Sequence, residues 1–284
     1  MRARVNGIDL FFDVVGAQLA PEQDRVRERP SIVLMHGGPG MDHMVFRPAL
    51  DRLSVHAQVI YIDHRACGRS QSGAEASWNL DQWADDLAEL IRLLGIPRPI
   101  VLGTSFGGMV AQRFAARHPD RLSGLVLMCT AARAAVAETC EAMTALGGAE
   151  AGQVARRFFT DIEAPGAIEN YLRTCLPLYS YRTPDPAVLA RVQTNEKVML
   201  HFLRPGGEFH TVDLFHDLQA TTAPTLVIYG KNDPVRPRAL AEELLEQLGV
   251  DRKQLVGLES CSHFAEQDAP EQIIAAIRQF FTLA

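Results

Sequence analysis

The stretch Gly103-Thr104-Ser105-Phe106-Gly107 lies between the apolar run 99–102 and a helix-forming stretch over residues 109–116. A serine on a sharp turn between a buried strand and a helix presents its Oγ above the sheet, and glycines two residues away on either side leave room for the crowded turn. The five-residue pattern alone is also compatible with an ordinary strand-to-helix turn. Its flanking strand and helix favour a nucleophile elbow, with Ser105 as the nucleophile.

Around this turn, strand-like and helix-like segments alternate along the first 130 residues. This alternation is typical of a parallel sheet flanked by helices. The predicted fold class is therefore α/β, with a mostly parallel central sheet and flanking helices. The expected strands are 3–5, 8–15, 31–35, 58–62, 99–102 and 124–129, and the expected helices are 80–94 and the stretch from the elbow to residue 118.

The alternation stops over residues 131–217, which contain several amphipathic segments but no clear buried strand. It returns with an expected strand at 224–229, a helix at 239–248, a strand at 253–258 and a terminal helix at 270–281. We therefore predict an α/β core made of residues 1–130 and 218–284, with a helical cap inserted over residues 131–217.

Two later loops offer a base and an acid for the serine. A serine hydroxyl is a poor nucleophile at neutral pH, so it requires a base, whose tautomer and cation an acid then stabilises. Asp233 and His263 each follow a predicted strand, which places both at the edge of the sheet where open α/β sheets hold their sites. We predict Ser105, Asp233 and His263 as a catalytic triad, in the chain order typical of such an elbow. The competing residues, which lack a preceding strand in this order, are Asp213, Asp217, Asp251, His201, His210 and His216.

The glycine-rich segment 36–40, His-Gly-Gly-Pro-Gly, follows the strand at 31–35. Acyl transfer requires backbone donors for the developing oxyanion, and glycines let the main chain approach the substrate closely. We predict the N–H groups of Gly38 and Phe106 as the oxyanion hole, and Gly37 as a further substrate-binding position. A simple glycine turn is the alternative interpretation. His36 is expected to support this loop rather than to act in catalysis.

These motifs together resemble the α/β-hydrolase fold family and, within it, the proline iminopeptidase group. The resemblance rests on residues 36–40, on Asp-His-Arg-Ala-Cys-Gly-Arg-Ser at 63–70, on the elbow, and on the Asp233 and His263 loops. It implies release of an N-terminal amino acid, often proline, from a peptide or an aminoacyl amide. It also implies that no metal or cofactor takes part.

In the iminopeptidase group, glutamates of the cap bind the substrate ammonium. The resemblance implies this role for Glu196, with Glu208 as a second candidate, although a solvated helix face is the alternative role for Glu196. The sequence departs from the group at Ala66, where glycine is usual, at Phe106, where tryptophan is common, and at Pro234, where some relatives carry an acid. Threonine before the serine and phenylalanine after it also resemble ester, lactone and carbon–carbon bond hydrolases.

Composition and charge argue against several other classes of protein. Apolar residues make up 47% and charged residues 22% of the chain, the net charge is -6, and there is no long basic run, so we expect a globular protein that binds no nucleic acid. The five cysteines have no zinc-binding spacing. The sequence also lacks a secretory signal pattern and a membrane-spanning stretch, which predicts a cytoplasmic enzyme without a membrane partner.

The sequence thus predicts a serine hydrolase that removes an amino acid from a small molecule or short peptide with a free amino terminus, without metal or cofactor. An esterase, lactonase or carbon–carbon bond hydrolase with the same triad is the first alternative. A non-catalytic ligand receptor on the same fold is the second. The oligomeric state and the identity of the leaving group stay open.

Overall fold

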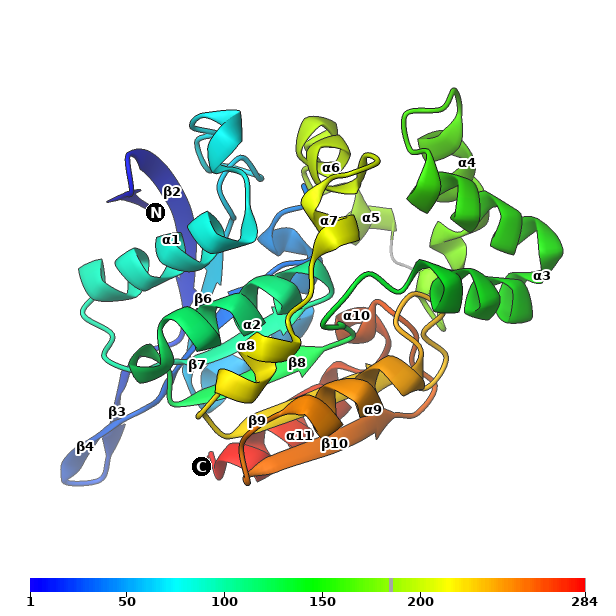
Figure 1. Ribbon diagram of the computed structural model, residues 1–284. Helices are drawn as coiled ribbons and strands as arrows, with labels where there is room; N and C mark the ends of the chain where they lie inside the picture. The colour runs from blue at the N-terminus through cyan, green and yellow to red at the C-terminus, as the bar shows by residue number, and fades with distance from the viewer. Residues whose placement is uncertain (184–185, 284) are drawn as a thin grey trace.

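The computed structural model describes residues 1–183 and 186–283 and has a sheet of eight strands at its centre (Figure 1). The strand order is β1-β2-β6-β5-β7-β8-β9-β10. From β6 to β10 all neighbours pair in parallel, whereas β2 pairs antiparallel with both β1 and β6. The strands are β1 (Arg2–Val5), β2 (Ile8–Val15), β5 (Ser31–Met35), β6 (Gln58–Ile62), β7 (Ile100–Thr104), β8 (Gly124–Met128), β9 (Thr225–Gly230) and β10 (Lys253–Leu258). The predicted fold class, a mostly parallel sheet, is confirmed.

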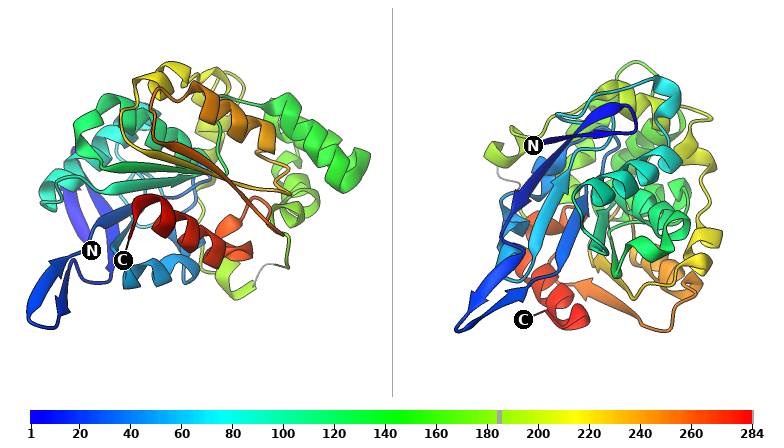
Figure 2. Two further views of the ribbon diagram at one scale, coloured as in Figure 1. Left: turned by 90° about the horizontal axis from the view of Figure 1, so that it is seen from below. Right: turned by 90° about the vertical axis from the view of Figure 1, so that its left-hand side faces the viewer.

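Helices cover both faces of this sheet, so every residue of the central strands β5, β7, β8 and β9 is buried. One face carries α1 (Leu80–Leu93), α2 (Phe106–Arg117), α8 (Phe215–Ala220) and α9 (Arg238–Gln247) (Figure 2, left). The opposite face carries η2 (Ala49–Val55) and α11 (Pro270–Phe281). Two apolar clusters follow from this arrangement, one around Trp83 and Phe114 and the other around Leu53 and Ile273.

The sequence did not predict the short elements that connect these layers. Strands β3 (Leu19–Glu22) and β4 (Arg25–Glu28) form a separate two-stranded hairpin that projects from the core (Figure 1). Its charged residues and Pro21 give no apolar alternation, which is why the sequence did not indicate strands there. The remaining short elements of the core are η1 (His43–Phe46), η3 (Glu75–Ser77), η4 (Pro119–Arg121) and α10 (Ala265–Asp268).

A group of helices between β8 and β9 lies over the carboxyl ends of the parallel strands (Figure 1), and we call it the cap. It comprises α3 (Val136–Thr160), α4 (Ala167–Thr174), η5 (Leu176–Tyr179), α5 (Pro186–Leu189), α6 (Glu196–Leu203) and α7 (Glu208–Thr211). The chain rejoins the core at α8, where Asp217 pairs with Arg113 of α2 at 3.3 Å. No helix of the described residues has the length and apolar character needed to cross a membrane.

Candidate active site

Ser105 sits on the turn between β7 and α2 with φ 52° and ψ -121°, a conformation that L-residues rarely adopt. Two contacts hold this turn: the Ser105 N–H donates to the Met128 carbonyl at 3.0 Å, and the Thr130 hydroxyl donates to the Ser105 carbonyl at 2.6 Å. Glycine is required on both sides, because a Cβ on Gly103 would collide with the backbone of Gly107, and a Cβ on Gly107 with the Met35 carbonyl. The local sequence therefore produces an elbow that exposes the hydroxyl.

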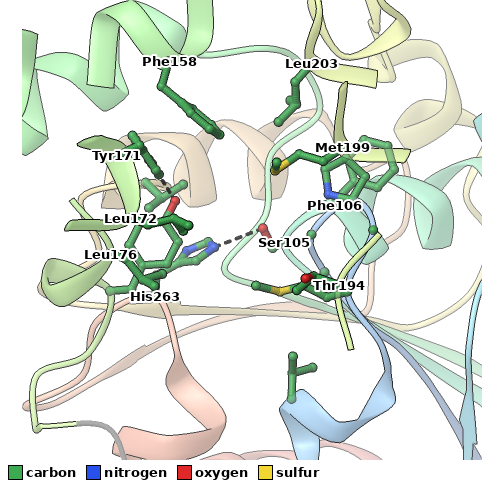
Figure 3. Close-up of a pocket in the computed structure, with 18 of the residues that line it drawn as sticks. Ser105, Phe106, Phe158, Tyr171, Leu172, Leu176, Thr194, Met199, Leu203 and His263 are labelled. Atoms are coloured by element: carbon green, nitrogen blue, oxygen red, sulfur yellow. Dashed lines mark hydrogen bonds between the residues drawn. The ribbon is translucent and has the colours of Figure 1, made fainter. Parts of the chain in front are cut away.

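The structure brings Ser105, His263 and Asp233 into one hydrogen-bonded series. His263 Nε2 lies 3.0 Å from Ser105 Oγ (Figure 3). On the other side of the ring, His263 Nδ1 lies 2.9 Å from Asp233 Oδ2. The other oxygen of Asp233 accepts the N–H groups of Val235 and Arg236, each at 2.8 Å. With Nδ1 donating to the carboxylate, Nε2 has no proton and can accept the serine hydroxyl. The arrangement can therefore deprotonate Ser105.

The glycine-rich loop lies beside the serine. Gly37 and Gly38 line the same pocket as Ser105, and a Cβ on Gly37 would lie 3.0 Å from the Cβ of Ser105. Phe106 is the first residue of α2, so its N–H has no partner within the helix. The oxyanion role of the Gly38 and Phe106 N–H groups stays a prediction that this placement supports.

His36 supports the loop from below. Its Nε2 accepts the His64 N–H at 3.1 Å, which leaves Nδ1 as the donor to the Gly37 carbonyl at 2.9 Å. Complete burial lowers the pKa of His36, because the charged ring would be cut off from water. The neutral ring therefore fixes the glycine loop to the following strand.

The segment 63–70 connects this loop to the cap. Asn195 of the cap donates from Nδ2 to the Ala66 carbonyl at 2.8 Å, and its N–H donates to the Gly40 carbonyl at 2.7 Å. Ala66 has φ 65°, in the left-handed region where glycine is favoured. These bonds hold the start of α6 over the candidate oxyanion loop.

The pocket above Ser105 is closed by the cap and is largely apolar. Figure 3 shows Phe158, Leu203 and Met199 directed toward the space above the serine. The ring of Tyr179 meets the ring of His263 edge-on at 5.0 Å, so the cap also backs the histidine. The other apolar side chains that line the pocket include Met41, Val45, Phe159, Ile168, Tyr171, Leu172, Leu176, Phe209 and Phe264.

The two predicted ammonium-binding glutamates have different positions. Glu196 is exposed and lines the pocket at the start of α6. Glu208 is not among the pocket-lining residues: its Oε2 accepts the N–H of Leu80 at 3.0 Å, at the start of α1. This placement does not support the predicted role of Glu208, because its carboxylate binds a free N–H at a helix N-terminus and lies outside the pocket lining.

Two buried ionisable residues, which were not among the predicted site residues, also line the pocket. Glu266, in α10, is 2% exposed, and burial raises its pKa to about 8. Arg236, in the loop after β9, is 4% exposed. The available signal was their spacing, because each follows a member of the predicted triad by three residues, Glu266 after His263 and Arg236 after Asp233.

Two clusters bring metal-binding side chain types together in the described residues: Cys129 with Asp233 and His263, and Asp42 with His43 and Asp63. In the first, Asp233 and His263 already bond to each other, and burial raises the pKa of the Cys129 thiol, which disfavours the thiolate that metals bind. In the second, His43 Nδ1 lies 2.7 Å from Asp63. An ion at either cluster would therefore compete with existing hydrogen bonds.

The sheet, the elbow and the hydrogen-bonded series have counterparts among known proteins. Residues 30–167 match the family model described as alpha/beta hydrolase fold. This chain has the alpha/beta hydrolase fold. The crystal structure of VinJ aligns with it at a TM-score of 0.81 and 22% identity, covering 100% of this chain and 98% of that one.

Curated relatives of this chain have different named activities. A proline iminopeptidase of Saccharolobus solfataricus is 25% identical over 294 residues, which cover 98% of this chain and 90% of the relative. Haloalkane dehalogenase 2 of Mycobacterium tuberculosis is 28% identical over 260 residues, with 89% and 88% coverage. The names of these two relatives describe different activities.

Proposed function

We propose that this protein is a serine hydrolase that releases an N-terminal amino acid from a short peptide or an aminoacyl amide through an acyl-enzyme. The observation that carries the proposal is the Ser105–His263–Asp233 series, which opens into a pocket beneath the cap. Its chemistry follows from the geometry of these three side chains, and its specificity follows from the carboxyl groups that line the pocket.

In the first half-reaction, His263 Nε2 takes the hydroxyl proton as Ser105 Oγ bonds to the substrate carbonyl carbon. The N–H groups of Gly38 and Phe106 stabilise the oxyanion, and each donor lowers the barrier by about 3 kcal/mol. His263 then returns the proton to the leaving nitrogen as the carbon–nitrogen bond breaks. Water repeats the sequence on the ester, and this step releases the free amino acid and restores the serine hydroxyl.

In this proposal, a carboxyl group in the pocket binds the ammonium group of the substrate. Glu266 is the inner candidate. A buried carboxyl with a pKa near 8 is mostly protonated at neutral pH, and it releases this proton to form an ion pair when an ammonium enters the pocket. Glu196 is the outer candidate at the exposed start of α6. The relatives named as proline iminopeptidases support an amine-reading site of this kind.

Ester or lactone hydrolysis is the second candidate function. The specific observation in its favour is that most side chains that line the pocket are apolar and that its buried acid is uncharged in the empty site at neutral pH. Such a pocket accepts an apolar acyl group without an ammonium. The same serine chemistry would then act on an ester oxygen.

An activity panel separates these two functions. The alanyl and prolyl 4-nitroanilides are compared with their N-acetylated forms and with 4-nitrophenyl butyrate. Release of 4-nitroaniline that is lost on acetylation supports the aminopeptidase, whereas hydrolysis of the ester alone would contradict it.

The Ser105→Ala variant is the control for the chemistry. We expect it to lose at least a thousandfold in kcat and to lose labelling by a fluorophosphonate probe, while its circular dichroism spectrum stays that of the wild type. Full activity in this variant would refute the acyl-enzyme mechanism. A wild-type protein that is neither labelled nor active would favour the receptor interpretation.

A further inference from the structure

Arg236 is a buried cation in the wall of the pocket. Its side chain is 4% exposed, and it contributes to the lining together with the cap residues above it. Arginine keeps its charge in proteins because its ordinary pKa exceeds about 12, and a buried guanidinium therefore needs compensating partners. The Arg236 guanidinium has few such partners among its hydrogen bonds.

The guanidinium uses little of its donor capacity. Nη1 donates to the carbonyl of Val235, its own neighbour, at 2.9 Å, and Nε is buried without a partner. In the part of the chain that the structure describes, Arg236 takes part in no ion pair with a carboxylate. The neighbouring Asp233 accepts the main-chain N–H of Arg236 and not its side chain. Most of the five donors of this group are therefore left without a protein acceptor.

The surroundings of Arg236 are aromatic. Its guanidinium carbon lies 5.7 Å from the centre of the Phe209 ring, a cation–π distance. Burial lowers the pKa of Arg236, while the charges of Asp233 and Glu138 and the hydroxyls of Tyr179 and Tyr171 act in the opposite direction. The free N–H groups of this guanidinium can bind a carboxylate, and the aromatic rings around it can pack against the apolar part of the same molecule.

We propose that Arg236 binds a carboxylate of the substrate inside the pocket. This proposal rests on the proposed function for the identity of the pocket and adds the class of substrate. Arg236 comes from the loop after β9 and Glu266 from α10, so the pocket contains one buried guanidinium and one buried carboxyl group on separate elements. A molecule with a free ammonium, an apolar body and a carboxylate satisfies both groups. A short peptide with a free carboxyl terminus has this composition.

A purely structural role for Arg236 makes a different prediction. In that case the guanidinium only fixes Val235 and Phe209, and its replacement changes stability without changing the preference for charged ligands. The two roles are therefore distinguished by a ligand pair that differs only in charge, measured by binding and not by turnover.

The test uses the Ser105→Ala protein and isothermal titration with 4-phenylbutyrate and 4-phenylbutyramide. We expect the carboxylate to bind at least tenfold more tightly than the amide. In the same background, Arg236→Gln should remove this preference without changing the affinity for the amide, and Arg236→Lys should retain part of it. Equal binding of the two probes, or a preference that survives Arg236→Gln, would overturn the proposal.

A second measurement decides the question if Arg236→Gln does not fold. In a crystal of the Ser105→Ala protein grown with 4-phenylbutyrate, we expect the carboxylate within hydrogen-bond distance of the guanidinium; a carboxylate bound elsewhere, or no bound ligand, contradicts the proposal. Because neither experiment requires hydrolysis, an inactive wild-type enzyme would refute the proposed function and leave this result standing. An active enzyme without carboxylate preference would refute only the role of Arg236.

Discussion

The buried carboxyl of Glu266 makes the stability of the protein depend on pH. Burial raises the pKa of this group from 4.5 to about 8, so the folded protein keeps a proton that the unfolded chain has already released. Between these two values the unfolded state binds fewer protons, and the free energy of unfolding falls as the pH rises. The contribution of Glu266 to the free energy of unfolding is therefore most favourable below pH 4.5. It falls as the pH rises and reaches its lowest value above pH 8.

The size of this effect follows from the two pKa values. Each pH unit corresponds to 1.36 kcal/mol, so a difference of about 3.5 units amounts to about 5 kcal/mol over the whole range, and to about 4 kcal/mol between about pH 5 and pH 8.5. Glutamine has the shape of the protonated carboxyl and does not ionise. We therefore expect Glu266→Gln to be more stable than the wild type at the higher pH and close to it at the lower.

Urea unfolding at both pH values, followed by circular dichroism, measures this difference. The matched control is Glu246→Gln, because Glu246 is exposed on α9 and its replacement should not alter the pH dependence. If the stability of Glu266→Gln relative to the wild type changes by less than about 1 kcal/mol between the two pH values, the reasoning about this buried acid is refuted.

Further predictions concern the same site. If Glu266 binds the substrate ammonium, KM for an alanyl anilide should fall by up to about tenfold per unit as the pH rises toward 8, where the free carboxyl ionises, whereas KM for a neutral ester should stay flat; a flat profile for both substrates would exclude this role. Asp233→Asn should lower kcat by about ten-thousandfold, because an amide at this position favours the wrong tautomer of His263, and stopped or continuous assays of the folded variant test this. Retention of more than a tenth of the activity would contradict it. Gly107→Ala should destabilise the protein by at least about 2 kcal/mol in urea unfolding, because the added Cβ collides with the Met35 carbonyl, which is backbone and cannot move aside; unchanged stability would show that the elbow tolerates a side chain there.

Much of the fold could be predicted from local patterns. The buried runs at β5, β6, β7 and β8 and the apolar stripe of α1 are visible along the chain, because strand and helix periodicities are local properties. The hairpin of β3 and β4 was missed because its pairing is not accompanied by a buried face. Strands with a buried face can therefore be predicted from the sequence, whereas an exposed hairpin leaves no apolar pattern from which to predict it.

The candidate site divides in the same way. The pattern of the elbow is visible in the sequence, whereas the reason for its glycines is only partly local: Gly103 packs on the backbone of Gly107 within the turn, but Gly107 packs on the Met35 carbonyl of the neighbouring strand β5. The order of Ser105, Asp233 and His263, and the strands before them, also follow from the sequence. Their hydrogen bonds, over separations of 158 and 30 residues, are formed only when the parallel strands align.

The direction in which the charged side chains face was decided by tertiary packing. Glu208 and Glu196 are both acids of the cap, yet one binds the start of α1 and the other lines the pocket. Glu266 and Arg236 line the pocket because the cap lies over α10 and over the loop after β9. Burial raises the pKa of the Glu266 carboxyl, and among the described residues the Arg236 guanidinium forms no ion pair. The sequence by itself indicated the strand, turn and helix around Ser105 and the order of the three candidate catalytic residues, because these are local patterns. The packing of the cap on the core decided which charges meet the substrate, because burial and its electrostatic cost depend on residues far apart in the chain.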